Sequence, residues 1–186
     1  TTTIGAMKQM LHMQTLPTTS FDVFVGSCTL ALQRLVNDGT VLTSPGHTTF
    51  HSPHPFFPLR EYVERIVTYA PCTAESFVVS LVYLKRFSTF QGKVFINPNT
   101  IHRLFLTSLL LAAKYCDDVF FNNKHYSRIG GISCKEMNAL ELEFLFRIKF
   151  ECNVSAAEFN QFSHILYEPE PFYPLLRCVH PAVSEG

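Results

Sequence analysis

Apolar residues recur along this chain with the three- and four-residue spacing of amphipathic helices, and few stretches alternate as strands do. The pattern predicts five consecutive helices between residues 58 and 167, preceded by one N-terminal helix whose apolar stripe must dock on them. Two of the five, at 74–87 and about 97–116, are apolar on most sides, so we expect them at the centre. Connections mostly shorter than about a dozen residues favour an all-α bundle of near neighbours.

Capping residues indicate where several of these helices begin and end. Ser20 is expected to cap the N-terminal helix, and Asn97 with Pro98 to open the second central helix. Between the second central helix and the next one, we expect a short turn of helix near residues 123–129, which Gly130-Gly131 stops.

Two capping boxes begin later helices. In a capping box, a Ser and a Glu three residues apart each accept a hydrogen bond from the other's backbone N–H through their side chains. Ser133 with Glu136 predicts a helix to about residue 149, and Ser155 with Glu158 predicts the last helix. The residues between them, 150–154, are expected to be a short extended piece.

The chain divides into one helical domain with flanking segments. Proline and glycine between residues 40 and 57 indicate a loop, which Phe50, Phe56 and Phe57 tether to the body. In order, we expect a flexible arm at 1–19, the N-terminal helix and tethered loop at 20–57, the helical domain at 58–168 and a Pro-containing tail at 169–186.

Composition limits the size and the surroundings of the protein. The 186 residues, 47% of them hydrophobic, can bury one generous core but hardly two. Lys plus Arg and Asp plus Glu number 15 each, so no global field favours nucleic acid or an anionic membrane. The six cysteines form no Cys-x-x-Cys pair, and no basic region leads into an apolar stretch at the N-terminus. We therefore expect an intracellular protein, nuclear or cytoplasmic, with reduced thiols.

Residue patterns typical of catalysis or cofactor binding are missing from the sequence. The eight histidines show no metal-ligand spacing, and no Gly-rich phosphate loop is present. Cys116, next to Asp117, lacks the cationic setting that would activate a thiol. We expect no catalytic residue, no metal, no cofactor and no small-molecule substrate.

One carboxylate interrupts the apolar stripe of the helix at about 133–149. Glu141 lies four residues after Met137 and three before Phe144, so helical geometry turns it toward the core. A buried carboxylate requires a cationic partner, and the best candidate is Lys114, which closes the most apolar helix of the chain. Two opposite charges in an apolar bundle predict a site.

Several sequence blocks around these two residues form a recognisable series. The blocks include Tyr62-Val63-Glu64-Arg65-Ile66, Leu81-Val82-Tyr83-Leu84-Lys85-Arg86-Phe87, Leu111-Ala112-Ala113-Lys114-Tyr115, Gly130-Gly131-Ile132 and Leu140-Glu141-Leu142-Glu143-Phe144-Leu145-Phe146. Their order and spacing closely resemble the cyclin box, especially that of single-box cyclins of the phosphate-pathway and P/U type. The resemblance extends from Pro17 to Glu168.

The resemblance implies a five-helix cyclin-box bundle with an additional N-terminal docking helix. It also implies a regulatory subunit, not an enzyme, that binds and allosterically activates a cyclin-dependent protein kinase. Cyclins carry a Lys and a Glu at the kinase interface, and these correspond to Lys114 and Glu141. The apolar rim that receives the kinase's regulatory helix is expected at Tyr115, Leu145, Phe150 and Cys152.

Other interpretations of the same residues stay open. Lys114 and Glu141 could be an internal pair without partner contact, and Leu145 and Phe150 could simply fill the core. Glu61 interrupts the patch with which cell-cycle cyclins dock substrates, so we do not expect that docking here. The same fold also occurs in transcription factors that grip DNA, which makes a nucleic-acid or transcription adaptor the alternative function; balanced charge argues against it.

Overall fold

The computed structural model describes residues 18–39, 48–52, 57–89 and 96–167. These residues form helices and no strand, which confirms the all-α prediction. The expected arm up to residue 17, the tether residue Phe56 and the Pro-containing tail lie outside the described residues. The helices are α2 (Thr18–Gly39), α3 (Leu59–Tyr69), α4 (Ala74–Thr89), α5 (Ile101–Cys116), α6 (Asn123–Gly130), α7 (Cys134–Arg147) and α8 (Ala156–Tyr167).

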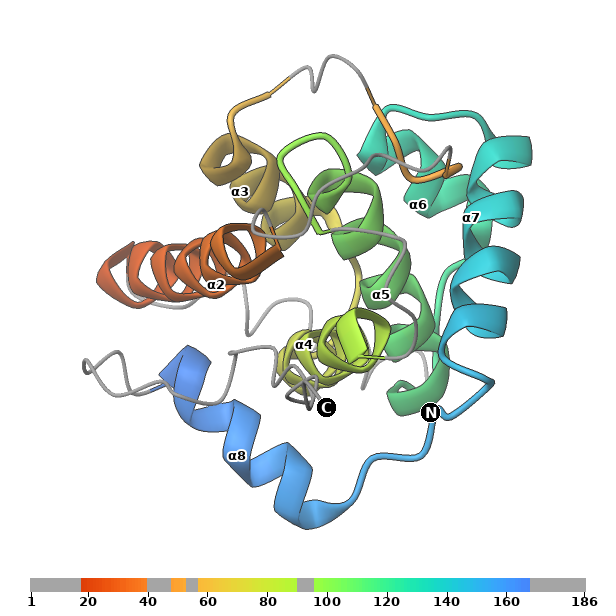
Figure 1. Ribbon diagram of the computed structural model, residues 1–186. Helices are drawn as coiled ribbons and strands as arrows, with labels where there is room; N and C mark the ends of the chain where they lie inside the picture. Colours follow the sequence, from red (N-terminus) through yellow and green to blue (C-terminus); the bar gives the residue numbers. More distant parts are fainter. Residues whose placement is uncertain (1–17, 40–47, 53–56, 90–95, 168–186) are drawn as a thin grey trace, which may run out of the picture.

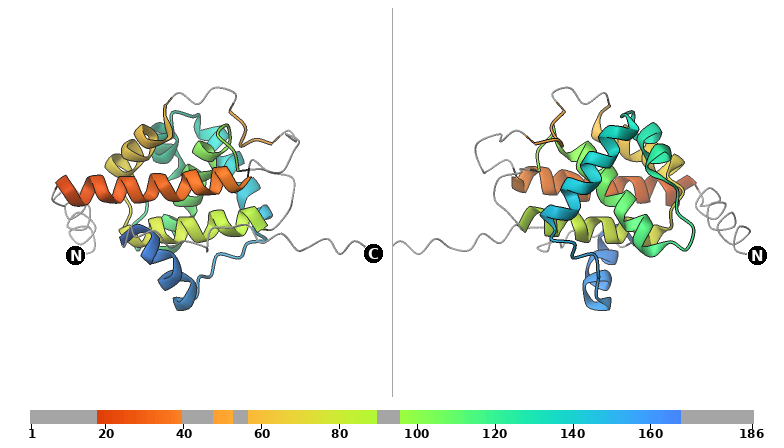
Figure 2. Two further views of the ribbon diagram at one scale, coloured as in Figure 1. Left: turned by 60° about the vertical axis from the view of Figure 1, so that its left-hand side comes forward. Right: turned by 90° about the vertical axis from the view of Figure 1, so that its right-hand side faces the viewer.

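Helices α4 and α5 pack on each other at the centre of the molecule, as their apolar character predicts (Figure 1). α7 covers α5 on one side together with α6, and α2 lies with α3 on the other. α8 packs against α4 and α2 and projects from the far end of the bundle (Figure 2). The central pair is therefore enclosed by the amphipathic helices.

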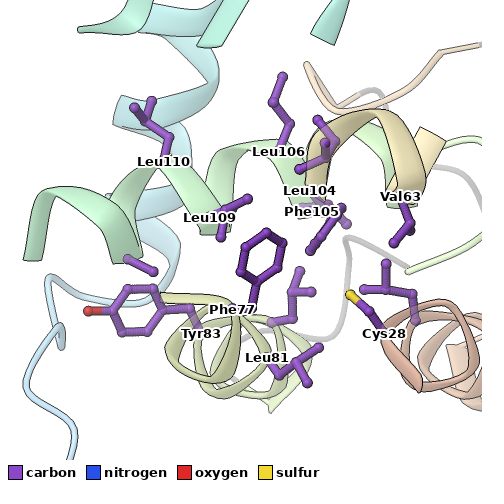
Figure 3. Packing of buried hydrophobic residues seen from close by; sticks show 14 of the residues in the cluster. Cys28, Val63, Phe77, Leu81, Tyr83, Leu104, Phe105, Leu106, Leu109 and Leu110 are labelled. Atoms are coloured by element: carbon purple, nitrogen blue, oxygen red, sulfur yellow. The ribbon is translucent and has the colours of Figure 1, made fainter. Parts of the chain in front are cut away.

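The interior is built from side chains of α4 and α5 with contributions from the surrounding helices. Phe77 of α4 points toward Phe105 and Leu109 of α5, while Cys28 of α2 and Val63 of α3 face the same interior (Figure 3). All five side chains are buried. Burying one Leu or Phe side chain contributes roughly 1.5–3 kcal/mol, so this interface stabilises the bundle on which the surface sites are built.

Two helix starts differ from their predictions. α2 begins at Thr18, so Ser20 lies within it rather than at its cap. α5 begins at Ile101 and not at Asn97, because the Asn97 side chain accepts a hydrogen bond from the Asn99 backbone N at 2.8 Å. The Thr100 and Ile101 backbone N–H groups both donate to the Asn97 carbonyl at 3.0 Å. Asn97 thus closes a local turn before the helix, an alternative that Asn side chains favour.

The short turn of helix expected at residues 123–129 is the eight-residue helix α6. Asn122 caps it by accepting a hydrogen bond from the His125 backbone N at 3.1 Å, and Gly131 ends it with a φ of 69°. Gly130 allows α6 to approach α5, because a Cβ at this position would overlap Leu106 Cδ2. The two glycines therefore stop the helix, as predicted, and also permit its close packing.

The two predicted capping boxes are used differently. Ser133 Oγ accepts from the Glu136 backbone N at 3.1 Å, but the Glu136 carboxylate forms an ion pair with Arg103 instead of completing the box. At α8 the box is complete, because Ser155 Oγ accepts from the Glu158 backbone N at 3.2 Å and Glu158 Oε2 accepts from the Ser155 backbone N at 3.0 Å. Side-chain partners from α5 thus replace one half of the first box.

The loop before α3 is tethered through Phe50, as predicted. Its ring is fully buried, and its centroid lies 5.4 Å from the ring centroid of Phe87 and 6.1 Å from that of Phe144. Arg103 Nη1 donates to the carbonyls of Thr49 and His51 at 2.9 and 2.6 Å, which fixes the backbone around the anchor. One aromatic side chain and one guanidinium therefore hold this segment against the bundle.

Candidate partner-binding site

Lys114 and Glu141 are in contact, as the sequence predicted. Lys114 lies in the last turn of α5 and Glu141 lies in the middle of α7, and Lys114 Nζ donates to Glu141 Oε1 at 2.5 Å. Their side chains keep 29% and 17% of their exposed surface. The pair is therefore shielded by the bundle but still open to solvent or to a partner.

Asn123, at the start of α6, holds the carboxylate from the other side. Its Nδ2 donates to Glu141 Oε2 at 2.6 Å and to Asn138 Oδ1 at 2.8 Å. Both carboxylate oxygens are thus engaged, whereas Lys114 Nζ has three N–H donors and uses one within the described part of the chain. The arrangement fixes the orientation of Glu141 and leaves Lys114 with spare donors.

The apolar residues of the predicted rim lie at the ends of α5 and α7 and in the segment after α7, and two of them are strongly exposed. Tyr115, adjacent to Lys114, is 50% exposed, and Phe150, beyond the end of α7, is 55% exposed. Leu145 lies one turn after Glu141 and is half-buried, as is Cys152. The structure therefore leaves accessible apolar surface on residues of the predicted rim, although their role in partner binding stays a prediction.

The C-terminal end of α7 displays Phe150 through an unusual backbone. Lys149 and Phe150 have φ values of 54° and 57°, and neither is a glycine. The Lys149 N–H donates to the Phe146 carbonyl at 3.1 Å, and the Phe150 N–H donates to the Leu145 carbonyl at 2.9 Å, which is a Schellman ending. The expectation of a simple extended piece from residue 150 is thus wrong at its first residue, because the orphan carbonyls of α7 capture these N–H groups.

The segment after Phe150 is anchored to the central helix α4. The Tyr83 hydroxyl donates to the Cys152 carbonyl at 2.7 Å, and Arg86 Nη1 donates to the Glu151 carbonyl at 2.6 Å. Left-handed residues other than glycine store roughly 1–3 kcal/mol each, and they persist when surrounding contacts hold them. Two such residues at the edge of the site, tied down by α4, show that the position of Phe150 is well defined.

Sequence reasoning missed several residues of this surface. Phe146 is 63% exposed, and its ring meets that of Phe150 edge to face with centroids 5.2 Å apart. Leu142 and Phe120 are also exposed. The available signal was that Phe146 and Leu142 fall off the buried stripe of α7, while the contact of Asn123 with Glu141 left no trace in helical spacing.

The cysteines near the site are not activated thiols. Burial raises the pKa of Cys116 to about 11, with a further contribution from the Asp117 carboxylate, and burial also raises the pKa of Cys152. Within the described ranges, no group of three or more His, Cys, Asp or Glu side chains could hold a metal ion. None of the described helices is long and apolar enough to cross a membrane.

Comparison with known proteins identifies the fold and its blocks. A family model described as Cyclin matches residues 7–152, a range that includes α2 to α7 and both charged residues. Cyclin-U4-1 of Arabidopsis thaliana is 44% identical over 137 residues, which cover 73% of this chain and 68% of that protein. The chain belongs to the cyclin family.

Two further relatives narrow the assignment within the cyclin family. Cyclin-P3-1 of Oryza sativa subsp. japonica is 41% identical over 116 residues, covering 62% of this chain and 49% of that protein. PHO85 cyclin-7 of Saccharomyces cerevisiae is 35% identical over 119 residues, covering 58% of this chain and 42% of that protein. The protein is thus a cyclin-box protein of the P/U type, and the chain spans about half the length of these last two relatives.

Proposed function

We propose that this chain is a cyclin-type regulatory subunit that binds and activates a cyclin-dependent protein kinase. The observation that carries the proposal is the partly exposed Lys114–Glu141 ion pair, together with the exposed rings of Tyr115 and Phe150, in a member of the cyclin family. The family relationship supports a regulatory role, and the geometry supports the choice of surface.

The physical argument begins with the cost of the pair. An ion pair taken out of water gains little net stability, because desolvation of the two charges offsets their attraction. This pair keeps spare hydrogen-bonding capacity at Lys114, and the rings of Tyr115 and Phe150 are exposed. A partner can therefore satisfy the ammonium with a backbone carbonyl while it buries Tyr115 and Phe150, which contributes about 25 cal/mol per Å² of apolar surface.

Activation would follow from differential binding to two kinase conformations. The proposed surface receives the kinase's regulatory helix and binds more tightly when that helix places its catalytic ion pair correctly. A ligand can shift an equilibrium only by its difference in affinity for the two states, so the contacts of Lys114, Glu141 and the apolar rim must form mainly in the active arrangement.

The test compares Lys114 of α5 with Arg147 of α7, two cations of similar exposure that each pair with a glutamate of α7. Arg147 is 28% exposed and pairs with Glu143 at 2.8 Å, much as Lys114 is 29% exposed and pairs with Glu141. Tagged wild-type protein, Lys114→Met and Arg147→Met would each be incubated with a panel of purified cyclin-dependent kinases. Capture of a kinase and phosphorylation of a peptide substrate would both be measured.

We expect Lys114→Met to weaken capture and activation by about tenfold or more, the effect of losing a central contact. Arg147→Met should behave like wild type in both assays. Equal behaviour of the two variants, with folding verified by circular dichroism, would show that the Lys114–Glu141 pair is not the kinase contact. Failure of wild-type protein to capture any kinase of the panel would reject the function itself.

A further inference from the structure

A concave surface lies between α3 and α6 and shares no residue with the partner-binding site. It is an open pocket of about 330 Å³ lined by Arg65, Tyr69, His125, Arg128 and Ile129. Three of these five side chains carry nitrogen donors and one is an aromatic ring. The proposed kinase contact gives none of them a role.

Arg65 is held rigidly at the wall of this pocket. Its Nε donates to the Ile129 carbonyl at 2.7 Å, and its Cζ lies 5.9 Å and 6.0 Å from the ring centroids of Phe57 and Tyr69. Its Nη2 also donates to the Arg128 carbonyl at 3.4 Å, so Nε and Nη2 cap the C-terminal end of α6, whereas Nη1 has no partner in the described part of the chain. A guanidinium is thus pre-oriented with unused donors.

The other donors of the pocket also lack acceptors. Arg128 is exposed, and no carboxylate of the described residues lies within ion-pair distance of it or of Arg65. His125 Nε2 is buried and has no hydrogen-bond partner among the described residues. Three other arginines do have carboxylate partners: Arg86, Arg103 and Arg147 each pair with a glutamate.

We propose that this pocket binds an acidic peptide segment of a partner protein through a carboxylate side chain. Two guanidinium groups with no carboxylate partner among the described residues make the pocket complementary to negative charge, and guanidinium groups match carboxylates with paired hydrogen bonds. Tyr69 and Ile129 supply an apolar wall on which the carbon stem of a Glu side chain packs. A structural role as a helix cap accounts for Arg65 but leaves Arg128 and His125 unexplained.

The test uses a fluorescein-labelled hexaglutamate peptide and a hexaglutamine peptide of the same length, with binding to the full chain followed by fluorescence polarisation. The variant is Arg128→Glu, whose exposed side chain makes no contact that the fold needs. The matched control is Arg60→Glu on α3, which changes the net charge by the same amount. Arg60 is not among the residues that line the pocket, and its Nη2 lies 3.9 Å from Asp22 Oδ1 of α2.

We expect hexaglutamate to bind and hexaglutamine to bind at least about tenfold more weakly, with affinity falling as salt is added. Arg128→Glu should weaken hexaglutamate binding by about tenfold or more, and Arg60→Glu by less than about twofold. Equal losses in the two variants would show a general charge effect and overturn the site. No saturable binding to wild type, or a phosphoserine peptide that binds tenfold tighter than hexaglutamate, would overturn the carboxylate assignment.

This inference is independent of the proposed kinase contact. Arg128→Glu should capture kinase like wild type, and Lys114→Met should bind hexaglutamate like wild type. If instead Arg128→Glu abolished kinase capture while leaving peptide binding unchanged, the pocket would belong to the kinase interface and the peptide proposal would be wrong.

Discussion

Two phenylalanines on α7, only two residues apart, have opposite surroundings. Phe144 is fully buried, and its ring lies 4.8 Å from that of Phe87 and 6.1 Å from that of Phe50. Phe146 is 63% exposed and contacts Phe150, which is 55% exposed and belongs to the predicted rim of the Lys114–Glu141 site. The same residue type on one helix therefore serves a closed aromatic cluster on one face and an open one on the other.

The difference separates the aromatic residues that hold the fold together from those that stay exposed on the proposed partner-binding surface. The closed cluster of Phe50, Phe87 and Phe144 ties the loop before α3 to the bundle, so its loss leaves a cavity. The open cluster of Phe146 and Phe150 has little to lose on truncation in the free protein, because both rings are already largely in water. Stability and partner binding should therefore respond to different substitutions on this helix.

The largest expected effect is on the closed cluster. Phe144→Ala should lower the free energy of unfolding by about 3–5 kcal/mol, the range for a fully buried aromatic residue. Phe146→Ala should change it by less than about 0.5 kcal/mol, as for a surface position. Urea denaturation followed by circular dichroism measures both values. A comparable loss in the two variants would mean that the open cluster also carries the fold.

Gly130 and Gly131 extend the same comparison to α6. Gly130→Ala should destabilise by about 1–3 kcal/mol, because its methyl group must displace the buried Leu106 side chain. Gly131→Ala meets no atom within 4 Å and suffers only from a φ of 69°, so a smaller loss of about 1 kcal/mol is expected. Urea denaturation of the pair ranks packing against backbone strain, and a larger loss at Gly131 would contradict the close approach of α6 to α5.

The ion pair between Arg86 of α4 and Glu158 of α8 is a charged contact that, like the closed cluster, should stabilise the fold. Hydrogen bonding to Arg86 lowers the pKa of Glu158 from 4.5 to about 2, so its contribution to stability is present above pH about 4.5 and is lost as pH falls to about 2. Because the side chain of Glu158 is 39% exposed, solvent screening limits the contribution to about 1 kcal/mol or less. Glu158→Gln should lose that much at pH 7 and show a shallower stability loss between pH 4.5 and 2 in urea titrations; an unchanged slope would contradict the lowered pKa.

Helical spacing predicted the parts of the site that depend on one helix at a time. The position of Glu141 in an apolar stripe and of Lys114 at the end of an apolar helix was enough to predict their contact. The role of Asn123 could not be predicted from the sequence, because its hydrogen bond to Glu141 depends on how α6 packs on α7. The Schellman ending that displays Phe150 was also missed, since Lys149 stands where glycine usually marks a left-handed residue.

The same limit applies to helix boundaries. The start of α5 was misplaced at Asn97, because a side chain that can cap a helix can equally close a turn before it. Glu136 was expected to complete its capping box, but Arg103 of α5 competes for its carboxylate. Local rules identified the helices and most of their buried faces, and tertiary contacts decided which of two local bonding patterns forms.

The most direct test of the central claim exchanges the two charges of the site. The double variant Lys114→Glu with Glu141→Lys keeps an ion pair, and the Asn123 amide can accept from the new ammonium as readily as it donates to the carboxylate. We predict a free energy of unfolding within about 1 kcal/mol of wild type, together with loss of kinase capture by about tenfold or more, because the partner meets reversed charges. Kinase capture and activation at wild-type levels by the exchanged pair would contradict the account and make the pair purely structural.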